Sequence, residues 1–168
     1  MDGRPGRCAA SGSYSLPIDV SAYIAVVGAG RASAEELATA HAVGARLAER
    51  GAVVVCGGLG GVMEAACRGA KSAGGTTVGI LPGLRRADAN EWVDVAIPTG
   101  LGEARNALVV RAADALIAVG GEFGTLSEIA LALKTGKRVV GIGTWDLPGD
   151  PIERASDAAA AVAAALLA

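Results

Sequence analysis

The segment GGEFGTLSE, Gly120–Glu128, combines three glycines with a hydroxyl and a carboxylate. Glycines at the start of a helix let backbone N–H groups approach a phosphate, and a threonine hydroxyl can donate to the same anion. The pair Thr125 and Glu128 also matches a capping box, in which both residues serve only to begin a helix. Capping leaves the glycines unexplained, so we predict phosphate contacts from four residues: Gly120, Gly121, Gly124 and Thr125.

Two other glycine-rich segments follow apolar runs. The segment CGGLGGVMEAA, Cys56–Ala66, is explained equally well by a tight turn with close helix packing and by an open anion site at a helix N-terminus. The second interpretation makes four glycines ligand contacts: Gly57, Gly58, Gly60 and Gly61. The segment GAGRAS begins at Gly28, a fifth predicted contact, and resembles a dinucleotide fingerprint. The acidic residue that would bind ribose hydroxyls is absent after the next strand, which disfavours NAD.

Arg105 and Asn106 end the segment TGLGEARN, which precedes a predicted helix. A lone arginine on a helix is usually solvated. This one is expected at the same edge of the sheet as the Glu128 carboxylate and the glycine segments, so we include both residues in the site. The three cysteines have no metal-ligand spacing, and no metal site is predicted.

The order of elements defines the fold class. Predicted strands cover residues 23–28, 52–56, 76–81, 93–97, 115–119 and 138–142. Predicted helices cover residues 33–50, 61–73, 102–112 and 126–135, and the Ala-rich end forms a last helix. Continuous Val and Ile runs indicate strands that are buried on both faces. Strand–helix alternation then predicts an α/β fold, a Rossmann-like, doubly wound parallel sheet with helices on both faces, in a single domain.

Ligands of such sheets bind beyond the carboxyl ends of the strands, near the point where the strand order reverses. That rule selects four loops: Gly28–Ala32, Gly57–Gly61, Pro82–Asn90 and Gly120–Thr125. Several strands therefore deliver glycines to one edge, and this convergence indicates a binding site more strongly than any single loop does.

Composition narrows the partners. Net charge is −2 with no run of Lys and Arg, so no nucleic-acid partner is expected. Residues 1–20 lack the apolar core of a secretion signal and predict a disordered tail before a domain at 21–168. No membrane span is expected, and cysteine usage fits the cytoplasm. The 52% hydrophobic content predicts burial between subunits, in a homodimer or homotetramer.

Taken together, these segments resemble the LONELY GUY (LOG) family. VGGEFGTLSEIALAL is similar to the PGGxGTxxE signature of that family, with Val119 in place of Pro. GEARNALVVRAADALIAV and CGGLGGVMEAACRGA are similar to two further family segments, and the resemblance spans about residues 23–142. It is closest to short bacterial proteins related to molybdenum-cofactor carriers and, more distantly, to the nucleotide-binding domain of DprA.

The resemblance implies a nucleoside 5′-monophosphate phosphoribohydrolase, which cleaves an N-glycosidic bond. The essential Arg and Glu of the family correspond to Arg105 and Glu128, and its phosphate loop to Gly121, Gly124 and Thr125. Asn106 stands where the family has Lys, which leaves the substrate open. A carboxylate such as Glu128 would stabilise positive charge on the sugar or activate water.

The residues leave a second interpretation open, because no second acid–base residue stands out to protonate the departing base. The alternative is a non-catalytic carrier of a phosphorylated pterin or nucleotide, with the molybdenum cofactor as one such ligand. No cofactor is required on either interpretation, and the expected partner is a small phosphorylated molecule. None of the three lysines has a pyridoxal-phosphate context, although relatives are often called lysine decarboxylases.

Overall fold

A computed structural model describes residues 21–167; the predicted disordered tail at 1–20 lies outside them. All seven strands form one parallel sheet in the order β4-β3-β2-β1-β5-β6-β7. The strands are β1 (Tyr23–Gly28), β2 (Val53–Cys56), β3 (Thr77–Leu81), β4 (Val95–Pro98), β5 (Ala115–Val119), β6 (Arg138–Ile142) and β7 (Glu153–Arg154). The α-helices are α1 (Ala34–Glu49), α2 (Val62–Ser72), α3 (Asn106–Arg111), α4 (Phe123–Lys134) and α5 (Ala158–Ala165). The predicted α/β class and the parallel sheet are confirmed.

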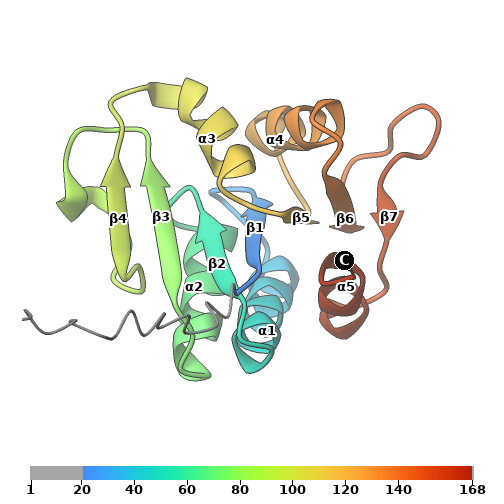
Figure 1. Cartoon of the computed structure of the whole chain (residues 1–168), viewed down its shortest axis with the longest axis horizontal. Coiled ribbons are helices and arrows are strands. Elements are labelled where there is room, and N and C mark those ends of the chain that lie inside the picture. Colours follow the sequence, from blue (N-terminus) through green and yellow to red (C-terminus); the bar gives the residue numbers. More distant parts are fainter. Residues whose placement is uncertain (1–20, 168) are drawn as a thin grey trace, which may run out of the picture.

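The strand order reverses between β1 and β5, which are adjacent in the sheet although far apart in sequence. Helices α1, α2 and α5 cover one face, and α3 and α4 cover the other (Figure 1). The fold is therefore doubly wound, as predicted. Its switch point, where a crevice forms beyond the strand ends, lies at the carboxyl ends of β1 and β5.

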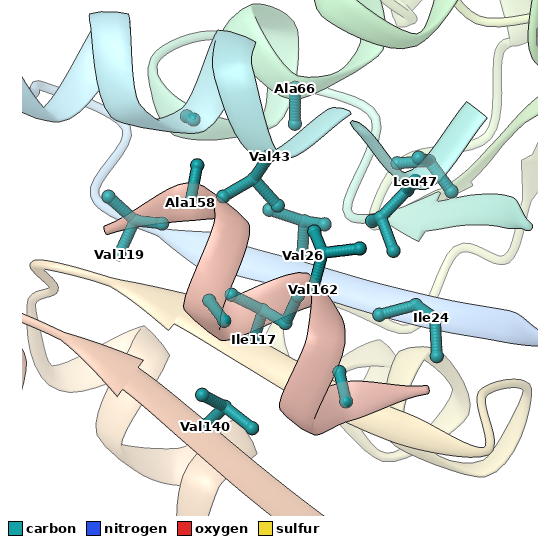
Figure 2. Close-up of a cluster of buried hydrophobic side chains, with 14 of the residues drawn as sticks. Ile24, Val26, Val43, Leu47, Ala66, Ile117, Val119, Val140, Ala158 and Val162 are labelled. Atoms are coloured by element: carbon teal, nitrogen blue, oxygen red, sulfur yellow. The ribbon is translucent and has the colours of Figure 1, made fainter. Parts of the chain in front are cut away.

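The core is built almost entirely from small and branched aliphatic side chains, as the low aromatic content requires. On the face of α1, α2 and α5, Val26 of β1 and Ile117 of β5 are fully buried against Val43 and Val162 (Figure 2). A second cluster fills the face of α3 and α4. Because each central strand contributes to both clusters, its sequence is continuously apolar rather than alternating.

Helix α1 begins at Ala34, one residue after the predicted start. Ser33 is its N-cap, and its hydroxyl accepts from the Glu36 N–H at 3.2 Å while the Glu36 carboxylate accepts from the Ser33 N–H at 2.7 Å. This reciprocal pair is a capping box that the sequence stretch SAEE indicates. It fixes the direction in which the chain leaves β1, and with it one wall of the crevice.

Helix α4 corrects the capping-box interpretation of Thr125 and Glu128. The helix begins at Phe123 after the N-cap Glu122, so Thr125 is its third residue and Glu128 lies in its second turn. Neither side chain caps the helix. Both are buried, with exposed fractions of 2% and 6%. The helix begins earlier than the predicted start at residue 126. Glu128 therefore lies within the helix, where its carboxylate faces Arg105.

Two other elements differ from the sequence prediction: the segment before α3 and the last strand. The predicted helix at 102–112 divides into a 3₁₀ turn, Gly102–Arg105, followed by α3. The strand β7 follows β6, which the sequence indicated as the last strand. Its two residues, Glu153 and Arg154, are charged and exposed, so no apolar run marks the strand. None of the helices within residues 21–167 combines the length and apolarity needed to span a membrane.

Helices α1 and α2 cross at two glycines. A Cβ atom on Gly44 would overlap the Ala66 carbonyl oxygen, and one on Gly69 would overlap the carbonyl of His41. The two helix backbones are therefore in direct contact, and both helices pack against the same face of β1 and β2. Neither glycine has a positive φ, so close approach explains both.

We expect Gly44→Ala to lower the free energy of unfolding by about 1–3 kcal/mol, because the added methyl group forces the helices apart. Gly124→Ala is the matched control: Gly124 is also helical, and a Cβ there meets nothing within 4 Å. That control should be neutral or slightly stabilising, since Ala is the better helix former. Urea unfolding measures both variants. A Gly44→Ala protein with a wild-type midpoint would contradict the close crossing.

Candidate functional site

A cavity of about 270 Å³ opens at the switch point of the sheet. Its wall combines residues that are far apart in sequence but share the carboxyl edge of the strands. They are Val27, Gly28, Ala29, Gly30, Leu59, Met63, Pro82, Gly102, Glu103, Arg105, Asn106, Glu122, Gly124, Thr125 and Glu128. All four loops selected from the sequence reach this wall. The volume lies near the lower end of the range of small-molecule sites.

Arg105 is the only cationic side chain of that wall, and it is 8% exposed. One guanidinium nitrogen donates to the Asn106 side-chain oxygen, and another donates to the Gly57 carbonyl at 3.4 Å. The buried Nε has no hydrogen-bond partner among the described residues. An unpaired donor on a buried charged group is costly, so the fold does not fully satisfy the hydrogen-bonding capacity of Arg105.

Glu128 faces Arg105 from α4, with 3.7 Å between its Oε1 and the arginine Nη1. Burial raises the pKa of Glu128 to about 7, and the Arg105 charge offsets only part of that effect. A carboxyl group with this pKa can accept or donate a proton at neutral pH. Perturbed acids of this kind are typical of functional sites, although buried ion pairs with no function also produce them.

Gly57 leaves the space that the Arg105 guanidinium occupies. A Cβ on Gly57 would lie 2.8 Å from the guanidinium carbon of Arg105 and 2.8 Å from the Met63 sulfur. A side chain at position 57 would require the guanidinium to move from this place at the end of β2. Gly57 therefore positions the arginine, and it is not itself part of the cavity wall.

Asn106 connects Arg105 to the first turn of α4. Its amide nitrogen donates to Ser127 Oγ at 2.9 Å, and Ser127 donates to the Gly124 carbonyl at 2.7 Å. Because the other end of the Asn106 amide accepts from Arg105, a continuous hydrogen-bonded chain holds α3 against α4. Asn106 is thus placed both to line the cavity and to fix the arginine.

The structure places four of the ten sequence-predicted ligand contacts in the cavity wall and six outside it. The wall includes Gly28, Asn106, Gly124 and Thr125, and Gly57 lies directly behind Arg105. It does not include Gly58, Gly60, Gly61, Gly120 or Gly121. The predicted catalytic residues, Arg105 and Glu128, both belong to the wall.

Packing accounts for Gly120 and Gly121. The φ angle of Gly121 is +132°, and a Cβ there would lie 2.7 Å from the Thr125 Cβ. A Cβ on Gly120 would overlap the Glu36 carboxylate of the α1 capping box. The two glycines therefore let the chain turn sharply between β5 and α4. This conformation brings Thr125 and Glu128 to the crevice.

Sequence reasoning missed two carboxylates of the wall. Glu122 is the N-cap of α4, and Glu103 comes from the 3₁₀ turn before α3; both are exposed at the cavity. Glu122 stood inside the GGEFGTLSE motif without a role. Met63, to which the sequence analysis gave no role, also lines the cavity. Only the convergence of separate loops assigns these residues to one site.

Cys56 and Cys67 are buried neighbours with 3.4 Å between their sulfur atoms. The hydrogen bond with Cys67 lowers the pKa of Cys56, and the same hydrogen bond raises the pKa of Cys67. Cys56 is not part of the cavity wall, as expected for a structural cysteine rather than a nucleophile. Residues 21–167 contain no cluster of three His, Cys, Asp or Glu side chains suited to a metal ion.

The sequence model of the SLOG cluster4 family matches residues 21–165. An uncharacterized protein of Archaeoglobus fulgidus is 52% identical over 120 residues, which cover 71% of this chain and 78% of that protein. The structural likeness to DNA processing protein A of Helicobacter pylori, with 19% identity over 84% of this chain and 78% of that one and a TM-score of 0.64, shows the fold alone.

Two solved structures are much more similar. The molybdenum cofactor binding protein of Rippkaea orientalis has 38% identity and a TM-score of 0.82, with 86% of this chain and 95% of that one covered. The molybdenum cofactor carrier protein of Chlamydomonas reinhardtii has 38% identity and a TM-score of 0.78, with 86% and 96% covered. The expected relation to such carriers is confirmed, whereas the LOG-specific assignment stays a prediction.

The pKa of Glu128 predicts how stability depends on pH. Its folded-state pKa, about 7, exceeds the ordinary value of 4.5, so the folded protein holds a proton that the unfolded chain has released. At low pH this group does not lower the free energy of unfolding. As the pH rises from 4.5 through about 7, that free energy falls by about 3 kcal/mol in total. In Glu128→Gln this contribution is absent.

Urea unfolding at about pH 5 and about pH 8 tests this expectation. Relative to wild type, Glu128→Gln should become more stable at the higher pH by up to about 3 kcal/mol. The comparison removes the effect of every other titrating group, because both proteins share them. Parallel stability profiles for the two proteins would mean that Glu128 is ionised normally in the fold.

Proposed function

The chain belongs to the SLOG cluster4 family, and from that premise we propose that it binds and carries a small phosphorylated heterocycle, with the molybdenum cofactor as the favoured ligand. The 38% identity to two proteins described as binding or carrying this cofactor, over 86% of the chain, is the observation that carries the proposal. On this proposal the cofactor is cargo, and the protein's task is to hold it without reaction.

The chemistry of the cavity fits such a ligand. A pterin presents an amino group and ring N–H donors along one edge, and the wall offers the carboxylates of Glu103, Glu122 and Glu128 as acceptors. The Arg105 guanidinium, which is part of the same wall, would supply a donor for a ring nitrogen or carbonyl oxygen of the ligand. Val27, Leu59 and Met63 provide the apolar surface against which a flat ring can pack.

The residues act by binding and orienting. Arg105 is held by Gly57, Asn106 and Glu128, so its side chain would lose little conformational entropy when a ligand binds. Because the pKa of Glu128 is about 7, its carboxyl group is partly protonated near neutral pH. It can therefore accept from a ring N–H or donate to a ring nitrogen. One site can therefore accommodate more than one tautomer of the heterocycle.

A second function is favoured by one observation. Glu128 and Arg105 face each other in the cavity, and the carboxyl pKa is raised to about 7. This arrangement resembles the pair that the LOG family uses for N-glycosidic cleavage of nucleoside 5′-monophosphates. The ionised carboxylate would stabilise positive charge on the sugar, and Arg105 would hold its orientation. No second acid faces the pair within the buried part of the wall.

Cofactor retention tests the carrier proposal. The purified protein is mixed with molybdenum cofactor released from a molybdoenzyme, separated by gel filtration, and assayed for bound pterin after oxidation to its fluorescent form. We expect wild type to retain the cofactor and Arg105→Ala to bind at least about tenfold more weakly, since a charge-assisted hydrogen bond is lost. Arg111→Ala, an exposed position on α3, is the control and should bind normally. Wild-type protein that elutes without pterin would overturn the proposal.

Turnover of nucleotides tests the second function. Wild type is incubated with a panel of nucleoside 5′-monophosphates, and free base is measured by chromatography. On the carrier proposal no base is released. Release that falls about a hundredfold or more in Glu128→Gln, with the fold intact, would instead establish hydrolysis. Arg105→Ala would then impair the same reaction without adding to the loss, because the two residues act together.

A further inference from the structure

The charges of the cavity raise the question of where a phosphate group would bind. Three carboxylates line the wall, from Glu103, Glu122 and Glu128, against the single guanidinium of Arg105. That guanidinium already faces Glu128 and donates to two neighbours. Like charges repel most strongly where solvent is excluded. Of the three carboxylates only Glu128 is buried, and solvent screens the other two, but a phosphate dianion here would still meet more negative than positive charge.

The N-cap of α4 strengthens this argument. Glu122 occupies the position from which a helix dipole attracts anions, and its carboxylate is part of the cavity wall. A second anion at that helix end would meet a like charge. The expectation of a phosphate at Gly120–Thr125 is therefore disfavoured by a residue inside the same motif.

A second pocket, of about 300 Å³, adjoins the cavity across Gly30, which lines both. Its charged residues are Arg31, Arg68 and Glu64, so its net charge is positive, opposite to that of the cavity. We call it the arginine pocket. The remaining wall consists of Gly30, Ala32, Leu37, Gly61 and Ala65.

The two arginines come from different elements, Arg31 from the loop after β1 and Arg68 from α2. Neither forms an ion pair within 4 Å or a side-chain hydrogen bond with the residues described at 21–167, although Glu64 lies in the same pocket. The pocket also includes Gly61, the N-cap of α2, where no side chain caps the helix. Two guanidinium groups with free donors can bind a phosphate from two sides.

We propose that the arginine pocket is the phosphate subsite of this protein. A phosphorylated ligand then lies across Gly30, with its heterocycle at the carboxylates of the cavity and its phosphate between Arg31 and Arg68. The ring placement rests on the proposed function, whereas anion binding at the arginine pocket does not depend on which heterocycle is carried. Arg31 and Arg68 lie in the segments GAGRAS and CGGLGGVMEAACRGA, and the sequence analysis assigned no role to either arginine.

Titration with inorganic pyrophosphate tests the subsite directly. Amide chemical shifts of the ¹⁵N-labelled protein report where the anion binds. We expect shifts centred on Gly30, Arg31 and Gly61, with affinity at least about tenfold lower in the double variant Arg31→Gln/Arg68→Gln. Arg111→Gln, on the opposite face of the sheet, is the control and should bind as wild type does. Affinity in wild type should fall with added salt, and this dependence should weaken in the double variant.

Two outcomes overturn the subsite: no wild-type shifts at millimolar pyrophosphate, or shifts centred on Gly124 and Thr125 that survive in the double variant. Cofactor retention separates this inference from the proposed function. If wild type retains the molybdenum cofactor and the double variant retains it equally well, the subsite fails and the carrier proposal stands. If pyrophosphate binds at the arginines but no cofactor is retained, the carrier proposal fails and the subsite stands.

Discussion

The buried guanidinium of Arg105 is the interaction on which the rest of the site depends. A charge with an exposed fraction of only 8% is stable only if its donors are paired and an opposite charge is near. The fold meets these needs from three separate elements: the Gly57 carbonyl after β2, the Asn106 amide on α3 and the Glu128 carboxylate on α4. Each contact also constrains the element that makes it. A side chain at position 57 would displace the guanidinium, and α4 must direct Glu128 toward Arg105. The Nε has no partner among the described residues, so the fold does not fill all the donors of this guanidinium.

Electrostatics divides the crevice into two parts that suit different chemical groups. The carboxylates of the cavity favour N–H donors of a heterocycle, and the arginine pocket favours an anion. Gly30 separates the two, and it belongs to the loop after β1, at the centre of the sheet. The doubly wound fold produces this arrangement, because loops from both halves of the sheet meet only at the switch point. A phosphorylated heterocycle is a molecule with both kinds of group at opposite ends.

Much of the fold could be read from local patterns. Continuous runs such as YIAVVG and ALIAV indicate strands that are buried on both faces, and their alternation with helices implies a parallel sheet. The start of α1 was predicted to within one residue, because its cap depends on four consecutive residues, Ser33–Glu36. The strand β7 was not readable, since Glu153 and Arg154 pair with β6 through backbone groups alone and leave no apolar trace. The start of α4 was misjudged because the Thr125-x-x-Glu128 spacing fits a cap equally well in isolation.

The sequence by itself determined that Arg105, Asn106, Thr125 and Glu128 lie at the carboxyl edge of a parallel sheet, because strand order and loop position follow from periodicity. Only the tertiary structure decided what the glycines do: Gly57 makes room for Arg105, and Gly121 lets the chain fold back against Thr125. It also decided which charges share a pocket: Glu122 and Glu128 line the cavity, and Arg31 and Arg68 line the arginine pocket. The physical reason is that a turn residue depends only on its own backbone, whereas burial, pKa and charge balance arise from neighbours that the chain brings together from distant positions.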